Sequence, residues 1–169
     1  MSKSQYEQDF VRWAEQQARA IRDAGNAGTN LPIDWENVAE EIDSLGRSQR
    51  TELRSRLRAI IAHLMKLEAS PATEPRRGWE ETIRGQRSEL ELLLEDSPSL
   101  RQEIPTLIAR ALPRAVDEAS RSLAVRGEQP KVQLDRIQYT VDEVLGDWLP
   151  EHPPPVSRAK GPRRRARNT

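Results

Sequence analysis

The sequence predicts an all-α protein, a small helical bundle of about five helices in which the second helix is long. Apolar residues recur at steps of three and four along most of residues 4–150, the period of helices with one buried face. Charged residues make up 32% of the chain and hydrophobic residues 36%, which suits helices with broad solvated faces better than a sandwich or barrel. There is no internal repeat and no convincing strand pattern.

The first helix is predicted to run from Ser4 to Gly25. Ser4 and Glu7 form the S-x-x-E pattern of a capping box, which starts a helix. Gly25 is expected to end it, because glycine adopts the left-handed C-cap conformation without steric cost. The apolar face between them consists of Tyr6, Phe10, Trp13, Ala14, Ala18 and Ile21.

The second helix is expected to start after Asp34, its N-cap, and to end at "ASPATEP", where proline breaks it. Its phase survives Gly46, which leaves two interpretations open: one long helix, straight or kinked at Gly46, and two separate helices. The expected buried stripe begins with Val38, Ile42 and Leu45 and continues with Leu53, Leu57, Ile60, Leu64 and Leu67.

Polar residues form a margin along one side of this stripe. They are Glu41, Ser48, Glu52 and His63. Glu41 and His63 are 22 residues apart in the sequence, about 33 Å along one helix, and folding the chain back at Gly46 still leaves a mismatch of about 18 Å. The two residues are therefore not expected to share a site.

The remaining helices are predicted over 76–95, over 98–126 and in a short segment after Thr140. Ser97 is expected to cap the 98–126 segment, which Pro105 and Pro113 should kink or restart. Thr140 and Glu143 form a second capping box. The apolar side of 76–95 is Trp79, Ile83, Leu90, Leu93 and Leu94, and Tyr139 with Val144 forms a hydrophobic staple around the last helix start.

His63 and Gln86 are the better candidates for a polar pair. If the second helix and helix 76–95 form a hairpin closed near residue 72, His63 lies opposite Thr82, with Trp79 and Gln86 within reach. Such a histidine is either a buried residue hydrogen-bonded in the core or part of a functional cleft. Lys66 and Arg87 lie on the margins of the same faces, where they either add positive charge to a cleft or remain solvated.

The sequence offers no ligands for a metal, no cofactor motif and no catalytic residues. The Glu-x-x-His motif of di-metal helical bundles is absent, because Ile60 stands three residues before His63. There is no cysteine and no phosphate-binding glycine motif. The N-terminus lacks a signal peptide, and no apolar stretch approaches the roughly 20 residues of a membrane helix, so a soluble cytoplasmic protein is expected.

Residues 151–169 are expected to form a disordered, Pro/Arg-rich tail after the domain of residues 4–150. The tail is basic, with a net charge of +5, whereas residues 1–150 hold 21 basic and 26 acidic side chains, a net charge of −5. The tail either contacts nucleic-acid phosphates without sequence preference or is an inert, solubilising terminus. Its basic residues are Arg158, Lys160, Arg163, Arg164, Arg165 and Arg167.

Three segments, taken in order, resemble a bacterial family known only as domain-of-unknown-function family twenty-nine. They are "VAEEIDSLGRSQRTELRSRLRAIIAHLMK", "GWEETIRGQRSELELLLEDSPSL" and "YTVDEVL". The resemblance runs from about Tyr6 to Trp148 and implies a small, soluble, all-helical bacterial protein. It implies no activity and provides no catalytic residues. The Arg-rich end and the loop after Gly25 do not resemble the family pattern.

Three functions remain as hypotheses. The first is a non-enzymatic binding or scaffold protein that acts through helical faces on a protein partner or on itself. The second is nucleic-acid association through the basic tail. The third is an enzyme with a cleft around His63, Lys66 and Gln86, for which the sequence offers no mechanism.

Overall fold

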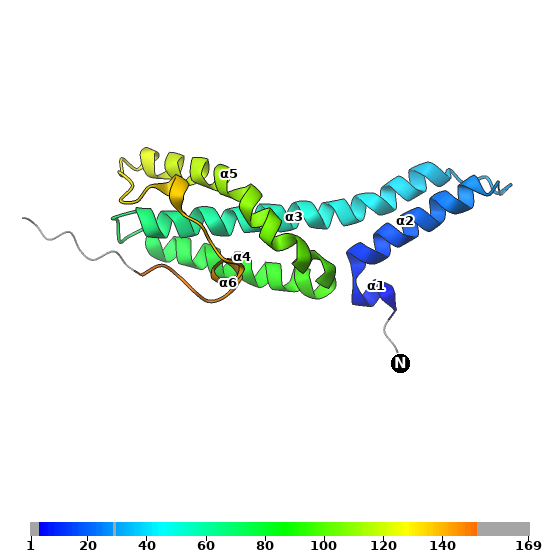
Figure 1. Cartoon of the computed structure of the whole chain (residues 1–169), viewed down its shortest axis with the longest axis horizontal. Helices are drawn as coiled ribbons and strands as arrows, with labels where there is room; N and C mark the ends of the chain where they lie inside the picture. The colour runs from blue at the N-terminus through cyan, green and yellow to red at the C-terminus, as the bar shows by residue number, and fades with distance from the viewer. Residues whose placement is uncertain (1–3, 29, 152–169) are drawn as a thin grey trace, which may run out of the picture.

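The structure is a computed structural model that describes residues 4–28 and 30–151, and this part of the chain is helical without a strand (Figure 1). The all-α prediction is confirmed. The elements in chain order are α1 (Gln5–Gln8), α2 (Phe10–Asn26), α3 (Trp35–Ala69), α4 (Arg76–Asp96), the 3₁₀ helix η1 (Pro98–Glu103), α5 (Ile104–Val125), the 3₁₀ helix η2 (Leu134–Arg136) and α6 (Val141–Leu145).

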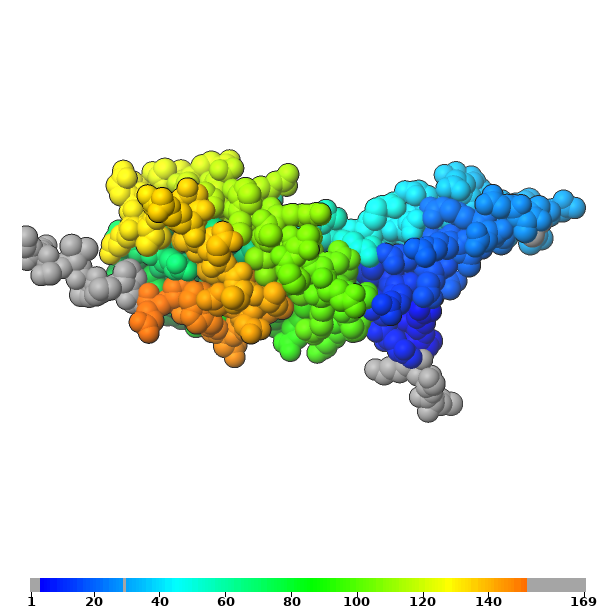
Figure 2. Space-filling view, in the orientation of Figure 1, coloured from blue at the N-terminus to red at the C-terminus, as the bar shows by residue number. Residues whose placement is uncertain are grey.

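The molecule is elongated and has two parts that share α3 (Figure 1). The N-terminal half of α3 pairs antiparallel with α2, and this helical hairpin, which we call the arm, extends away from the rest of the molecule (Figure 2). The C-terminal half of α3 packs against α4 and α5, with α6 beside them, to form what we call the body. Most of the large apolar side chains are buried in the body.

The core of the body is built around the C-terminal half of α3, which is buried on nearly all sides. Its fully buried large side chains are Leu53, Leu57, Ile60, Ile61, Leu64, Met65 and Leu67. They belong to one cluster with Ile83 and Leu90 of α4 and Leu123 of α5. Because α3 supplies most of the fully buried large side chains, the folding of the body depends on this helix.

The arm is held together mainly by small residues. Ala14 and Ala18 of α2 and Ala39 and Gly46 of α3 are buried where the two helices meet. A Cβ atom on Gly46 would lie 3.8 Å from the Cβ of Ala14, an ordinary van der Waals contact. Apart from Val11, which is fully buried beside Gly46, the larger apolar side chains of the arm lie at its edges.

Helix α3 is continuous over 35 residues and passes through Gly46 without a break, so one long helix is the correct alternative. Asp34 caps it as expected, since its side chain accepts a hydrogen bond from the backbone N–H of Asn37. Helix α5 also continues through Pro113, and it bends along its length (Figure 1). Pro105 lies in its first turn, where the missing N–H costs no helical hydrogen bond.

The predicted helix from Ser4 to Gly25 starts where expected, but it is interrupted at Asp9 and does not end at Gly25. The Ser4 capping box is present but starts only α1, because Asp9 adopts an extended conformation and begins α2 as a new N-cap. Gly25 lies inside α2, not at its C-cap. A Cβ there would lie 2.6 Å from the Cβ of Trp35, so glycine is required for close approach of the tip of the arm to the start of α3.

Asp9 and Ser97 connect the arm to the body. The Asp9 carboxylate accepts from the backbone N–H of Arg12 and also from the N–H and hydroxyl of Ser99. Ser97 was expected to cap the following helix, but its buried hydroxyl accepts from the N–H of Val11 and donates to Gln49. These bonds fix the base of α2 against both α3 and η1.

Candidate functional site

His63 and Lys66 lie in α3 beside Trp79 of α4. The Nδ1–H of His63 donates to the carbonyl of Ala59, one turn earlier, at 2.8 Å. The Lys66 ammonium is 6.0 Å from the centre of the Trp79 ring, and Arg126 is 5.8 Å from that centre. Burial lowers the pKa of His63, and the nearby positive charge of Lys66 lowers it further. Burial also lowers the pKa of Lys66.

Gln86 is not the partner of His63. Its side-chain oxygen accepts from Arg56 at 3.2 Å, and Arg56 precedes His63 by seven residues, about 10 Å along α3. The expected hairpin of α3 and α4 is present, yet His63 takes its hydrogen bond from its own helix. The geometry around His63 is that of a half-buried histidine, three residues before Lys66, whose ammonium lies over the Trp79 ring.

Arg87 has a structural position that its sequence did not indicate. Its guanidinium donates to three backbone carbonyls, those of Glu143, Val144 and Trp148, at 2.7–2.9 Å. These carbonyls belong to the end of α6 and the segment that follows it, where a helix leaves its last carbonyls without partners. Arg87 therefore holds the C-terminal segment against α4 and does not line a cleft with His63.

Glu41 and Ser48 are exposed on α3. Ser48 and Gln86 line a shallow hollow of about 610 Å³ between α3 and α4, together with Arg56. Glu41 lies in the arm, far from His63 because α3 is continuous, as its spacing predicted. The seven polar residues singled out in the sequence therefore lie in several places and do not converge on one site.

The basic tail lies outside the described residues, so the contacts of Arg158, Lys160, Arg163, Arg164, Arg165 and Arg167 are a prediction only. Within residues 4–28 and 30–151, no group of three or more His, Asp or Glu side chains is arranged to hold a metal ion. No helix in this part of the chain is long and apolar enough to cross a membrane.

A second candidate surface lies on the arm, where the sequence predicted burial. Val38 and Leu45 of α3 are 41% and 43% exposed, although both were expected in the buried stripe, and Ile42 between them is half-buried. The prediction was wrong because α2 contacts α3 through Ala39 and Gly46, about 80° around the helix from Val38. The stripe is amphipathic as predicted, but only its C-terminal half is covered.

Helix α2 contributes a matching stripe. Phe10, Trp13 and Ile21 are half-buried and lie on the same side of the arm as Val38 and Leu45. Tyr6 of α1, 54% exposed, packs edge-on against Trp13 with ring centres 4.8 Å apart. We define the apolar arm face as Phe10, Trp13, Ile21, Val38, Ile42 and Leu45.

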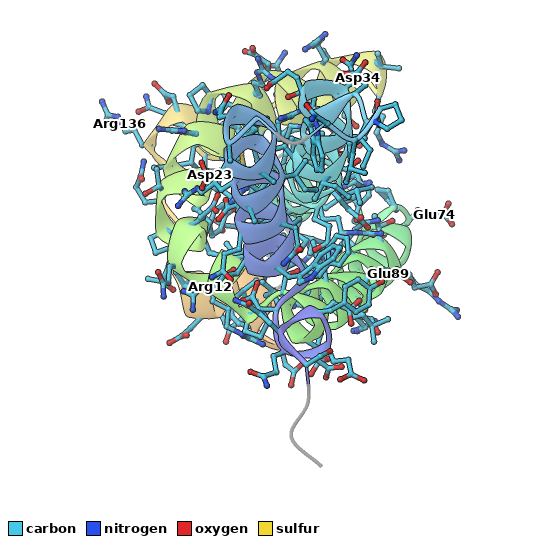
Figure 3. The ribbon with its side chains drawn as sticks, turned by 90° about the vertical axis from the view of Figure 1, so that its right-hand side faces the viewer. Arg12, Asp23, Asp34, Glu74, Glu89 and Arg136 are labelled. Carbon is cyan, nitrogen blue, oxygen red and sulfur yellow. The ribbon has the colours of Figure 1, made fainter. Side chains whose placement is uncertain are left out.

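The opposite side of the arm is ion-paired. Arg22 of α2 reaches Asp43 at 2.8 Å and Glu36 at 3.3 Å on α3, and Arg50 reaches Glu15 at 2.6 Å. Figure 3, which looks at the tip of the arm, shows charged side chains such as Arg12 and Asp23 extending from α2 on the side away from Asp34 and the start of α3. The arm thus has one charged side and one apolar side.

Comparisons with known proteins give a family and a fold without an activity. A family model described as "Domain of unknown function DUF29" matches residues 5–149. The chain is similar to the crystal structure of an alpha-helical protein of unknown function from Rhodospirillum rubrum, with 28% sequence identity and a TM-score of 0.72, covering 85% of this chain and 90% of that one. No curated protein matches.

Proposed function

This chain belongs to the DUF29 family, whose description assigns no function, and we propose that it is a binding protein that self-associates through its arm. The proposed interface is the apolar arm face, and its occupant is the same face of a second copy. The supporting observation is that two apolar stripes face one side of the arm and remain partly exposed, with Val38 at 41% and Leu45 at 43%. The cytoplasm is the proposed compartment.

The shape of the arm supports a second copy as the occupant. Two helices expose one apolar side, and the closed arrangement that buries such a side is a four-helix bundle made from two hairpins. Helix α2 has 17 residues, about 25 Å, and two neighbouring helices are about 20 Å wide. The whole side of the arm that carries the apolar arm face is therefore about 500 Å² on each copy, and contact over all of it would reach the roughly 1,000 Å² total that specific interfaces need.

The charge distribution supports the same occupant. A two-fold interface places a surface against itself, so a surface of one charge sign would repel its copy. The border of the apolar arm face is mostly uncharged, with Gln17 on α2 and Asn37 and Ser44 on α3, while Glu41 stands at its edge. Two charged side chains of α2, Glu15 and Arg22, pair with α3 on the other side of the arm.

Sedimentation velocity of the full chain over a range of concentrations tests this proposal. We expect a concentration-dependent dimer for the wild type. The double variant Val38→Glu, Leu45→Glu should be a monomer with an unchanged helical circular dichroism spectrum, because both side chains are already partly exposed in one copy. The matched control is Leu92→Glu, Val125→Glu, which changes two exposed apolar residues of the body and should still dimerise.

Two results would overturn self-association through the arm. One is a wild type that remains a monomer at millimolar concentration, which would leave the face to a different protein or to solvent. The other is a dimer that persists in the Val38, Leu45 variant but is lost in the Leu92, Val125 control, which would place the interface on the body.

A further inference from the structure

A group of arginines lies in a groove between α3 and α5 that the arm does not touch. The groove has a volume of about 480 Å³, with Thr51, Arg54, Ser55 and Arg58 on one wall and Leu107, Arg110, Ala111 and Arg114 on the other. Each wall therefore carries two arginines spaced one helical turn apart, and no acidic residue lines the groove. Its sequence signal is the i, i+4 spacing on two separate helices.

Three of the groove arginines, Arg54, Arg110 and Arg114, form no ion pair within the described residues, unlike their neighbours on α3. Arg47, Arg50 and Arg56 each form an ion pair at 2.5–2.8 Å. By contrast, the guanidinium groups of Arg110 and Arg114 make neither a hydrogen bond nor an ion pair within the described residues. Among residues 4–28 and 30–151, Arg54 donates only to the carbonyl of Arg50, in its own helix.

Arg58 adds a second, independent observation. Its Nε is buried and has no hydrogen-bond partner among the described residues. The nearest carboxylate oxygen, on Glu118, is 3.8 Å away, which is beyond hydrogen-bond distance. A buried donor without a partner costs free energy, and native structures rarely leave one without an acceptor. The Nε itself is closed off from solvent, so a ligand in the groove would meet the rest of the Arg58 side chain, which is 42% exposed.

We infer that the groove between α3 and α5 binds a phosphate group, held between Arg54 and Arg58 on one side and Arg110 and Arg114 on the other. Guanidinium groups present paired donors that match the oxygens of phosphate, and they remain charged at every physiological pH. Four converging arginines favour a ligand with more than one negative charge. This cluster of four positive charges contrasts with residues 1–150 as a whole, which carry a net charge of −5.

The hydroxyl groups of the groove fit the same ligand class. Ser55 makes no hydrogen bond within the described residues and is free to donate, whereas the Thr51 hydroxyl donates to the carbonyl of Arg47 at 2.9 Å. Leu107 and Ala111 supply an apolar base. A second hollow of about 600 Å³ shares Arg58 and Arg114 but is also lined by Asp117 and Glu118, whose negative charge disfavours a phosphate there, so the ligand is expected in the groove itself.

Titration of the full ¹⁵N-labelled chain with sodium pyrophosphate at constant ionic strength tests this inference. The readout is the set of arginine Nε–Hε signals, which separates the groove from the arginines of the tail. We expect saturable shifts at Arg58 and its three neighbours. Arg110→Glu with Arg114→Glu should weaken binding at least tenfold, while the control Arg12→Glu with Arg19→Glu, which changes net charge equally on the arm, should not.

The inference is overturned if chloride produces the same shifts, if the shifts do not saturate, or if both double variants lose binding equally. Should the groove variant fold poorly by its backbone spectrum, Arg110→Gln with Arg114→Gln replaces it. A dodecamer of deoxythymidine is then added to the pyrophosphate complex. Displacement at the groove signals identifies a nucleic-acid backbone as the phosphate source, and retention identifies a small phosphorylated molecule; both outcomes support a phosphate site.

Discussion

Two glycines of the arm, Gly25 and Gly46, should respond in opposite directions to the same change, Gly→Ala. Both are inside helices, so the intrinsic helix propensity favours alanine at each by about 1 kcal/mol. Their surroundings differ. A Cβ on Gly46 meets Ala14 at 3.8 Å and Val11 at 3.9 Å, whereas a Cβ on Gly25 would lie 2.6 Å from the Cβ of Trp35.

The magnitudes follow from these distances. At Gly46 the added methyl fits without displacement, so Gly46→Ala should raise the free energy of unfolding by about 1 kcal/mol. At Gly25 the obstacle is the Cβ and Cγ of Trp35, which cannot move without its backbone, and overpacking of this kind costs about 1–3 kcal/mol. Since the propensity gain of about 1 kcal/mol offsets part of that cost, Gly25→Ala should lower the free energy of unfolding by up to about 2 kcal/mol.

Urea unfolding followed by circular dichroism measures both variants against the wild type. A change of 1 kcal/mol corresponds to about 2–4 °C in Tm for a chain of this size, so thermal unfolding gives a second reading. Destabilisation by Gly46→Ala, or stabilisation by Gly25→Ala, would refute the prediction. The first result would mean that α2 approaches Gly46 more closely than described, and the second that Trp35 lies further from Gly25.

Two further predictions concern residues of the body. Arg87→Ala should lower the free energy of unfolding by about 2 kcal/mol, because it leaves three backbone carbonyls without a charged donor. Amide exchange should also become faster in residues 141–149. The control Arg84→Ala loses an exposed ion pair within α4 and should change the free energy of unfolding by less than about 0.5 kcal/mol. Burial lowers the pKa of His63 in the folded chain below its ordinary value near 6.5, which applies to the unfolded chain. At pH values between the folded and unfolded pKa, the unfolded chain binds more protons than the folded chain, so the free energy of unfolding rises with pH. Urea midpoints from pH 5 to 7.5 should show this slope in the wild type and a flatter one in His63→Gln; equal slopes would count against a buried neutral His63.

Local signals in the sequence were sufficient for the helices whose ends are fixed by neighbouring residues. The Asp34 cap and the capping box of Thr140 and Glu143 are present as predicted, because each depends on residues three apart. The Ser4 box was also correct, but Asp9 interrupts the helix to bond Ser99, a residue 90 positions away. No local pattern indicates such a partner.

The candidate sites required the same long-range information. The arginine spacing in α3 and in α5 is visible in the sequence, yet the groove exists only because α5 crosses α3 at that level. Likewise, the apolar stripe of α3 was recognised, but its exposure depends on which residues α2 contacts. Alanine and glycine gave a weaker hydrophobic signal than Val38 and Leu45, and they form the actual contact.

The length of the shared helix α3 fixes the orientation of the arm relative to the body. Between Gly46, which contacts α2, and Leu53, which enters the body core, the chain is an uninterrupted helix. Inserting a single residue there would turn the arm by about 100° about the helix axis and move it about 1.5 Å along it, away from its bonds to Ser97 and Ser99. Inserting seven would return the arm to within about 20° of its original direction, roughly 10 Å further out. The number of residues in α3 between the arm and the body therefore sets the direction in which the apolar arm face points.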